Sequence, residues 1–295
     1  MTIPDDIWKL GEARQVARLE RNYSLADEIR DDLLSKGWEI IDAGGEFELR
    51  PKLRYLVLEN VSSMHSVFEG REIAVAMIVS GFTEDAIDCI NSISAYSTTP
   101  IFILCLGEVG SLEEVVNEET LLVKVIDPCG WGQAANAILQ NVKSNYLVIM
   151  DPSTRLNGDA LTLVLDRFSA GEYSAIGWRG GLINIEDDWR SVDDKGSGEV
   201  DVLFSYFLAL NRESALEVGG FNARAIYYRN ADIEFSLRLR QTGGRLLQMD
   251  LPLTQGRHHG YHDVDAEFRE VQSKKNYDRI LERFRGKNAI LSPRR

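Results

Sequence analysis

Cysteine and proline are both scarce in this sequence of 295 residues, which contains three cysteines and seven prolines. Cys89, Cys105 and Cys129 are odd in number, and their spacing matches no zinc or redox motif. Each lies in or beside an apolar stretch, as buried free thiols of a reducing compartment commonly do. We therefore expect neither a disulfide scaffold nor a cysteine-based metal site, and we predict a cytoplasmic location.

Long apolar runs and a surplus of basic residues are also missing. The longest apolar runs, such as 73–79 and 101–106, are too short to cross a bilayer, and the first ten residues lack the apolar core of a signal peptide. Aspartate and glutamate number 46 against 33 lysines and arginines, which gives a formal net charge of −13. The short apolar runs lead us to expect no membrane span. Because the negative charge repels phosphate groups, we also expect no broad binding of nucleic acids or anionic membranes.

The composition is otherwise that of a globular protein, with 44% hydrophobic and 27% charged residues, and the chain falls into two unequal parts. Apolar residues between 7 and 34 recur at three- and four-residue spacing, which predicts helix. Ser24 is the expected cap of a second helix, and Gly37 ends it. Two short β segments, 38–41 and 47–50, follow across a glycine-containing turn. Residues 1–54 are thus predicted to form a small helical and β-hairpin unit.

From residue 73 onward, apolar runs alternate with helical patterns. The expected strands are 73–79, 100–106, 121–126 and 146–150, and the expected helices are 86–96, 113–119, 133–141 and 156–168. Strands that are apolar throughout and alternate with helices predict a parallel sheet covered on both faces. In such sheets, ligands bind beyond the carboxyl ends of the strands.

The second half is less regular. Its expected strands are 175–181, 200–210 and 245–249, its expected helices are 212–218, 232–242 and 266–284, and 185–198 reads as an acidic loop. Residues 54–66 have no clear pattern. We expect the tail, 266–295, to pack on its own domain or on a partner, which leaves a homo-oligomer open.

Two acidic positions are candidates for chemistry. Asp151 follows a buried apolar strand, where a carboxylate is costly unless it binds a metal or a hydroxyl, or caps the next helix. Asp232 and Glu234 begin a helix, where negative charge complements the helix dipole. A general base would require one of these two to face a cleft.

Three of the four histidines fall within five positions, at His258, His259 and His262. Histidine is the commonest metal ligand, so the cluster raises the odds of a metal site. The spacing matches no zinc motif, and a solvated polar loop explains the cluster equally well.

The order of several motifs resembles a known family. Gly130-Trp-Gly-Gln-Ala-Ala-Asn136 precedes the strand that ends at Asp151, Gly219-Gly220-Phe221 follows a later strand and helix, and Asp232 begins another helix. In this respect residues 70–265 resemble family 2-like glycosyltransferases. The resemblance implies the GT-A fold, an α/β architecture with a mixed, mostly parallel sheet and helices on both faces. It also implies transfer of a sugar from a nucleotide-diphosphate donor to an acceptor, which the sequence does not identify.

The resemblance implies roles for individual residues. Asp151 matches the first acid of the motif that holds a divalent metal (Mn²⁺ or Mg²⁺), and His258 or His259 would complete the metal site. Asp232 matches the catalytic base, which deprotonates the acceptor. The residues expected to bind the donor are Ser80, Gly81, Glu108, Gly130, Asn136, Asp151 and Ser153.

The sequence departs from the family pattern at several of these positions. Ser153 stands where the metal-binding motif has its second acid, and serine is a poor ligand for Mg²⁺ or Mn²⁺. Ala231 replaces the first acid of the acidic pair, and the segments 80–82 and 106–108 lack the family's usual residues. The alternative reading is a catalytically degenerate domain that only binds a sugar nucleotide or a partner.

The segment 21–42 has a resemblance of its own, to the C-terminal segment of cysteinyl-tRNA synthetases, which helps to contact the tRNA anticodon region. It implies RNA contact through basic side chains, namely Arg14, Arg18 and Arg21. The alternative is a borrowed hairpin that serves as a docking or dimer element. Acidic residues in the same unit favour that alternative, because they repel RNA.

Overall fold

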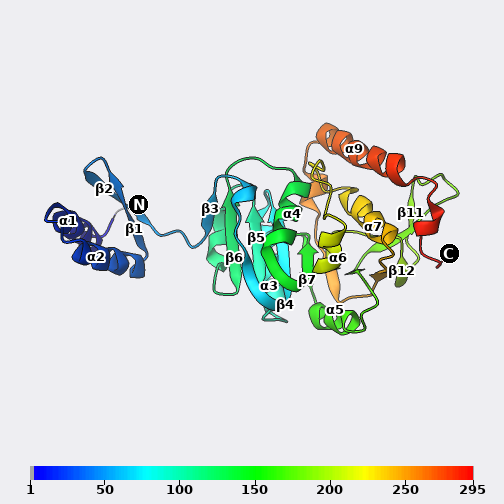
Figure 1. The fold of residues 1–295 in the computed structure, drawn as a ribbon, viewed down its shortest axis with the longest axis horizontal. Helices are drawn as coiled ribbons and strands as arrows, with labels where there is room; N and C mark the ends of the chain where they lie inside the picture. The colour runs from blue at the N-terminus through cyan, green and yellow to red at the C-terminus, as the bar shows by residue number, and fades with distance from the viewer. Residues whose placement is uncertain (1–2, 295) are drawn as a thin grey trace. The chain divides into compact units, whose positions relative to one another are not determined.

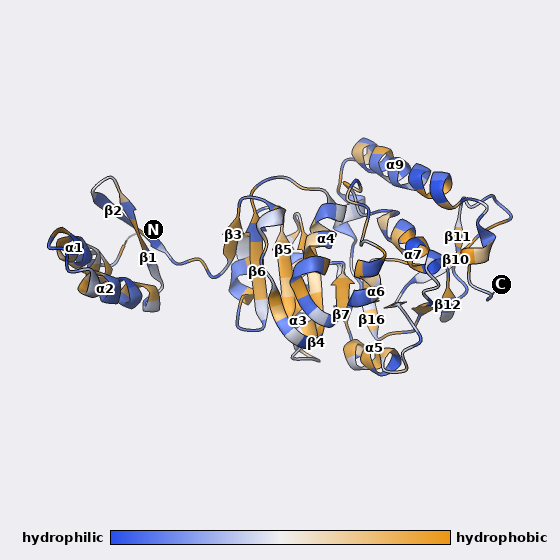
Figure 2. Ribbon diagram, viewed as in Figure 1, coloured by the Kyte–Doolittle hydropathy of each residue, from blue (hydrophilic) through white to orange (hydrophobic). Residues whose placement is uncertain are grey.

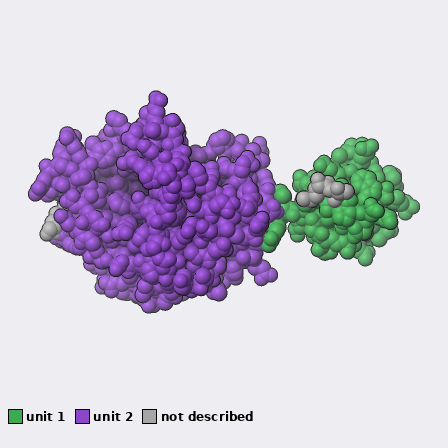
Figure 3. Space-filling view, turned by 180° about the vertical axis from the view of Figure 1, so that it is seen from behind, with its two compact units in different colours: residues 1–54 green, residues 55–295 purple. Residues whose placement is uncertain are grey.

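The computed structural model describes residues 3–294, and the chain divides into two compact units (Figure 3). The first unit ends at Arg54, and the second begins at Tyr55. Each unit has its own hydrophobic core. No helix within the described range is both long and apolar enough to span a bilayer.

The first unit is a helical hairpin beside an antiparallel β-hairpin. Its elements are α1 (Asp5–Leu19), α2 (Tyr23–Ser35), β1 (Trp38–Ala43) and β2 (Glu46–Pro51). Ile7, Leu33 and Leu49 form a small buried cluster between the two hairpins. The cap of α2 is Asn22, whose side chain accepts a hydrogen bond from the Leu25 amide, so the expectation of Ser24 was wrong by two positions.

Two of the arginines in this unit are engaged within it. Arg14 and Arg18 both pair with Asp42 on β1, at 2.7 and 2.6 Å, and the Arg14 side chain is buried. The hydrogen bond from Arg14 lowers the pKa of Asp42 below its usual value. These arginines therefore hold α1 against the β-hairpin. Their guanidinium groups are less available to bind the phosphates of a nucleic acid.

A nine-stranded mixed sheet forms the centre of the second unit (Figure 1). In spatial order the strands are β12 (Gly198–Val200), β15 (Leu246–Gln248), β9 (Ala175–Gly177), β14 (Phe207–Asn211), β7 (Val142–Met150), β4 (Val67–Val79), β5 (Ile101–Cys105), β6 (Thr120–Val125) and β3 (Leu56–Leu58). The run from β7 to β3 is entirely parallel, whereas β14 lies antiparallel between β7 and β9. The predicted mixed, mostly parallel sheet is confirmed.

Helices cover both faces of this sheet. They are α3 (Thr83–Ser94), α4 (Trp131–Asn141), α5 (Ala160–Phe168), α6 (Arg212–Glu217) and α7 (Ala231–Gln241). On β5, Ile101 and Ile103 face the core that includes α3 and α5, while Phe102 and Leu104 face the core that includes α4, α6 and α7. The segments 73–79 of β4, 101–105 of β5 and 147–150 of β7 are therefore apolar at every position, and the strands at the centre of the sheet are largely orange in Figure 2.

The structure differs from the elements predicted from the sequence at several places. The expected helix at 113–119 is a short 3-10 helix, Gly110–Val115, because the Asn117 side chain accepts hydrogen bonds from the amides of Glu119 and Thr120 and turns the chain into β6. The expected strand at 175–181 is broken into β9 and β10 (Gly180–Ile183). The unassigned stretch 54–66 contains β3 and a 3-10 turn at Val61–Ser63.

The apolar run at 200–210 is also not a single strand. It contains the end of β12, then β13 (Val202–Leu203) and, after a turn, β14. The turn at Phe204–Tyr206 is fixed by hydrogen bonds from Ser205 to Asp232 on α7. The apolar pattern of the sequence does not show that Ser205 is hydrogen-bonded to Asp232.

Two further segments complete the second unit. β8 (Thr154–Leu156) pairs with β16 (Leu253–Gln255), so the expected helix at 156–168 begins only at Ala160. The expected helix at 266–284 forms with those bounds as α9 (Ala266–Phe284). Its residues Ile280 and Phe284 share a buried cluster with Ile233 and Leu237 of α7.

Candidate functional site

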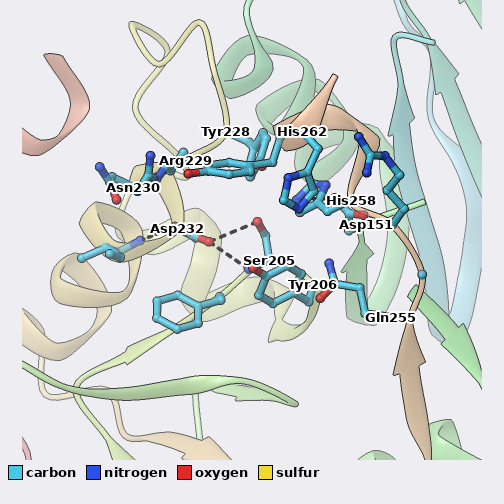
Figure 4. Close-up of a pocket in the computed structure, with 15 residues that line it drawn as sticks. Asp151, Ser205, Tyr206, Tyr228, Arg229, Asn230, Asp232, Gln255, His258 and His262 are labelled. Carbon is cyan, nitrogen blue, oxygen red and sulfur yellow. Dashed lines mark hydrogen bonds and ion pairs between the residues drawn. The ribbon is translucent and has the colours of Figure 1, made fainter. Parts of the chain in front are cut away.

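A cavity of about 550 Å³ opens beyond the carboxyl end of β7 (Figure 4). Its walls come from the Phe204–Tyr206 turn, the segment before α7, the start of α7, and the segment after β16. The lining residues that bear polar groups include Asp151, Ser205, Tyr206, Tyr228, Arg229, Asp232, Gln255 and His258. Two residues singled out in the sequence, Asp151 and Asp232, therefore line the same cavity from different elements.

Asp232 lies in the first turn of α7 and is only 6% exposed. Its Oδ2 atom accepts hydrogen bonds from the Ser205 amide at 2.9 Å and from the Ser205 hydroxyl at 3.1 Å, and its Oδ1 atom accepts one from the Ile233 amide. Burial nevertheless raises the pKa of Asp232 to about 6, because the apolar surroundings disfavour its charged form. The carboxylate can therefore exchange a proton near neutral pH.

Asp151 lies beside His258 in the wall of the cavity. One carboxylate oxygen of Asp151, Oδ1, accepts hydrogen bonds from the amide and the hydroxyl of Ser153. The other, Oδ2, lies 3.4 Å from His258 Nε2, a buried nitrogen that has no hydrogen-bond partner within residues 3–294. Burial lowers the pKa of His258, an effect partly offset by Asp151, so the imidazole is mainly neutral at pH 7.

This pair fits part of a divalent metal site. Asp151 Oδ2 offers a carboxylate oxygen, and the unpartnered His258 Nε2 offers a neutral imidazole nitrogen. No cluster of three or more histidine, cysteine, aspartate or glutamate ligands is found among the residues described. Two protein ligands are an incomplete set, so water and substrate phosphates would have to supply the rest, as they commonly do around Mg²⁺. The imidazole nitrogen is a ligand for transition metals, whereas Mg²⁺ prefers oxygen.

His259, the third predicted metal ligand, is engaged elsewhere. Its Nδ1 atom pairs with Asp263, its Nε2 atom lies 3.6 Å from Asp85, and Phe82 stacks on its ring at a centroid distance of 4.8 Å. Arg257 also pairs with Asp263. His259 therefore links the loop after β16 to the loop after β4, and its nitrogens do not point to Asp151.

A smaller cavity, of about 100 Å³, adjoins this region at the ends of β4 and β7. Several of the residues predicted to bind a donor or a metal line it together, namely Ser80, Gly81, Asp151, Ser153, His258 and His259. These residues come from three loops that are distant in sequence. Those after β4 and β7 lie at the carboxyl ends of neighbouring parallel strands, as the rule for such sheets predicts. The two histidines instead follow β16, which pairs with β8 outside the large sheet.

The structure does not bring Glu108, Gly130 and Asn136 into either cavity. Glu108 is exposed. The Asn136 side chain donates to the Phe221 carbonyl and accepts from the Phe221 amide, at 2.9 and 2.8 Å. A Cβ atom at Gly130 would lie 3.0 Å from the Ile226 Cα atom. The glycine and the asparagine thus fit α4 against the segment that precedes α7, a role in packing.

Several lining residues were missed by the sequence analysis. Ser205 and Tyr206 lay within the run that was read as a strand, and Tyr228 belongs to a segment without a clear pattern. A further supporting residue is Asn276 of α9, which is 1% exposed and donates hydrogen bonds of 2.8 Å to the carbonyls of Tyr227 and Arg229. The one available signal was an asparagine on the apolar face of an otherwise charged helix.

Comparison with known proteins gives a fold and nothing closer. No family model matches the sequence, and no curated protein matches it. The structure of GalNAc-T7 with UDP, GalNAc and Mn²⁺ matches with a TM-score of 0.55 and 14% identity over 72% of this chain. The chain spans only about half of that protein, 48%.

Two further solved structures match in the same way. The mannosyltransferase PcManGT from Pyrobaculum calidifontis, in complex with GDP-Man and Mn²⁺, has a TM-score of 0.55 and 13% identity, covering 94% of this chain and 75% of its own. S. aureus TarS in complex with UDP-GlcNAc has a TM-score of 0.50 and 12% identity, covering 71% of this chain and 66% of its own. Identities this low show the fold alone. The chain has the GT-A fold of nucleotide-sugar glycosyltransferases.

Proposed function

We propose that the protein is a glycosyltransferase that moves a sugar from a nucleotide-diphosphate donor to an acceptor hydroxyl. The observation that carries this proposal is the position of Asp232, a buried carboxylate with a pKa of about 6 that shares a cavity with Asp151 and His258. A base poised near the working pH suits removal of a hydroxyl proton during transfer. The similarity to solved structures with UDP or GDP sugars supports the donor class.

The proposed reaction forms one bond and breaks one. The acceptor oxygen attacks the anomeric carbon of the donor sugar and gives its proton to Asp232. The bond between that carbon and the diphosphate oxygen breaks, and the nucleoside diphosphate leaves with the electron pair. Because Ser205 and the Ile233 amide hold the Asp232 carboxylate, its orientation toward the cavity is fixed before the substrates bind.

Asp151 and His258 are the residues that we propose to hold a divalent metal. A bound cation would offset the negative charge on the leaving diphosphate. Ser153 has a different role in this proposal. Its amide and hydroxyl donate hydrogen bonds to Asp151 Oδ1, which leaves Oδ2 directed at His258.

A thermal-shift screen followed by a turnover assay tests the proposal. UDP-, GDP-, ADP- and dTDP-sugars, each with and without Mn²⁺, should include one that raises the unfolding midpoint, because a ligand of the native state stabilises it. Asp232→Asn should keep that shift and lose transfer by about 100-fold or more. Asp250→Asn, at an exposed aspartate outside both cavities, is the control and should retain activity. Wild-type turnover in Asp232→Asn would reject Asp232 as the base.

A second candidate function is a binding module that has lost turnover. The observation that favours it is the pairing of Asp151 Oδ1 with Ser153, which occupies an oxygen that a metal would otherwise use. A donor that raises the unfolding midpoint, with no transfer and no donor hydrolysis under any metal condition, would support this candidate. Release of nucleoside diphosphate from any donor would reject it.

A further inference from the structure

The second unit contains another hollow of similar size, about 540 Å³, that adjoins the site cavity. The two share Phe204, Tyr206 and Gln255 as a common wall. The remaining lining of the second hollow includes Trp178 and Arg179, from the connection between β9 and β10. A ligand that filled both hollows would have to pass the Phe204–Tyr206 turn.

This turn is fixed from three sides. The Phe204 amide donates a hydrogen bond of 2.9 Å to the Arg179 carbonyl, and the Tyr206 carbonyl accepts one of 3.1 Å from the Asp151 amide. Ser205, between them, donates to Asp232 through both its amide and its hydroxyl. The common wall is therefore tied both to the proposed catalytic carboxylate and to the edge of the second hollow, so it is ordered without a ligand.

The chemistry of the second hollow suits a neutral, polar ligand with a flat apolar face. The Arg179 guanidinium lies over the Trp178 ring at 4.4 Å from its centroid. Asp194 lines the same hollow, and a hydrogen bond from the Gly196 amide, helped by Gln248 and by the charge of Arg179, lowers the pKa of its carboxyl. Because one cation and one anion face the same space, their charges largely cancel for a bound ligand.

Sugar rings have the matching properties. Their hydroxyl groups accept from a guanidinium and donate to a carboxylate, and such charge-assisted hydrogen bonds are among the stronger ones. Their C–H faces pack on aromatic rings, which Phe204 and Tyr206 provide. Trp178 is only 8% exposed, and its ring supports the Arg179 guanidinium at the wall of the hollow. A hollow lined by aromatic side chains with a few placed polar groups is the usual form of a small-ligand site.

We propose that this hollow is a second acceptor subsite, which binds an uncharged sugar unit next to the unit that reacts at Asp232. The acceptor is then an oligosaccharide of at least two units. This inference rests on the proposed transferase function, because it takes the first cavity as the site of the reacting unit. Binding energy from the second unit would position the first one for reaction.

The test is a titration with sugars of increasing length. Malto-, cello-, manno- and chito-oligosaccharides, each as monomer, dimer and trimer, are titrated by calorimetry into the full chain together with the nucleoside diphosphate that raises its unfolding midpoint. We expect one series in which the dimer binds at least tenfold more tightly than the monomer. Arg179→Ala should abolish this gain and leave the affinity for the monomer unchanged.

A matched control is available in Arg167→Ala, which removes another exposed arginine that lies over an aromatic ring, Tyr173, but outside the hollow. This variant should still bind the dimer more tightly than the monomer. Trp178→Phe provides a second variant that retains most of the packing and should reduce the gain.

Equal affinities for monomer, dimer and trimer in every series would overturn the proposal, as would failure of every sugar to bind. A gain with length that persists in both Arg179→Ala and Trp178→Phe would also overturn it. Failure of the transferase function gives a different result, namely no donor that raises the unfolding midpoint and no release of nucleoside diphosphate from any donor, with or without an acceptor sugar.

Discussion

At the scale of single residues, two opposing effects act on the pKa of Asp232: burial raises it and hydrogen bonds lower it. Its three hydrogen bonds stabilise the carboxylate, but burial outweighs them and raises its pKa to about 6. Below about pH 3 the group is protonated in both folded and unfolded chains. As the pH rises from about 3 to 6, the unfolded chain releases the proton first, so the folded state loses stability.

Asp232→Asn should therefore increase the free energy of unfolding in a pH-dependent way. The shift from 3.8 to about 6 corresponds to roughly 3 kcal/mol at most, because one pKa unit is worth about 1.4 kcal/mol. The gain over the wild type should be near zero at about pH 3, grow to about pH 6.5 and stay constant above it. Urea unfolding of both proteins across this range measures it. A difference that does not change with pH would contradict the assignment.

The same group predicts the acid limb of the rate profile. Transfer needs the deprotonated carboxylate, so kcat/KM for the acceptor should fall tenfold per pH unit below about pH 6. The measurement is initial rate against pH with a fixed donor. An acid limb near pH 4, the ordinary aspartate value, would place the base in another group.

Asn136 is expected to be structural, although the sequence assigned it to the donor. Asn136→Ala removes two hydrogen bonds to the Phe221 backbone and should lower the free energy of unfolding by about 2 kcal/mol. Asn141→Ala, on the same helix with one hydrogen bond to Ala137, is the control and should cost less. Donor binding should be equal in both variants. A selective loss of donor binding in Asn136→Ala would restore the sequence assignment.

At the scale of elements, the packing of α4 depends on a glycine within it, Gly132. A Cβ atom at Gly132 would collide with the Asn222 carbonyl oxygen, whereas one at Gly81, in the loop after β4, meets nothing within 4 Å. Alanine normally favours a helix over glycine, so Gly132→Ala tests whether packing or helix propensity dominates.

Gly132→Ala should destabilise the chain by about 2 kcal/mol or more, in the range of overpacked cores. Gly81→Ala should stay within about 0.5 kcal/mol of the wild type, as substitutions in open space do. Thermal unfolding of the two variants side by side decides the matter. A stabilised Gly132→Ala would mean that the contact with Asn222 is easily relieved.

The central elements could be predicted from the sequence, and the irregular ones could not. The strands near 73–79, 101–106 and 146–150 were found because strands buried on both faces are apolar at every position. The same rule failed at 200–210, where Asp232 binds Ser205 and interrupts the run. The error at 113–119 had the same origin, since the Asn117 side chain ends the helix through local hydrogen bonds.

The site residues that lie at the carboxyl ends of parallel strands could be predicted from the sequence. Asp151 and the loop at Ser80–Gly81 lie at the carboxyl ends of β7 and β4, and the structure places them around one cavity. Tyr206 and Tyr228 could not be found, because an aromatic residue in an apolar run looks the same whether it lines a cavity or a core. Asn276 was missed for another reason. Its place on the apolar face of α9 could be seen in the sequence, but its partners are backbone carbonyls, which no sequence pattern identifies.

At the scale of the whole molecule, the two units have separate cores. Residues 55–295 alone should therefore fold, keep the unfolding midpoint of the large domain within about 2 °C and show the same shift with the donor as the full chain. Differential scanning calorimetry of both chains measures this. A loss of the donor shift on removal of the first unit would show that this unit takes part in donor binding.

The first unit should not bind tRNA. Arg14 and Arg18 are paired with Asp42, and the unit carries many acidic residues. Filter binding of the full chain to bulk tRNA at 20 mM salt, where electrostatic contacts are strongest, should show no complex at micromolar protein. Salt-sensitive binding that Arg14→Ala and Arg18→Ala abolish would reverse the preference for a docking or dimer element.

The strand at one edge of the large sheet, β3, has only three residues. Two of them are exposed apolar residues, Leu56 at 60% and Val57 at 45%. A long apolar edge of this kind would recruit strands from other molecules and seed aggregates. Because β3 has few unpaired backbone N–H and C=O groups, a strand from another molecule can form few hydrogen bonds with it. The shortness of β3 therefore limits aggregation through this edge. Substitutions that lengthen this edge would be expected to reduce solubility before they reduce activity.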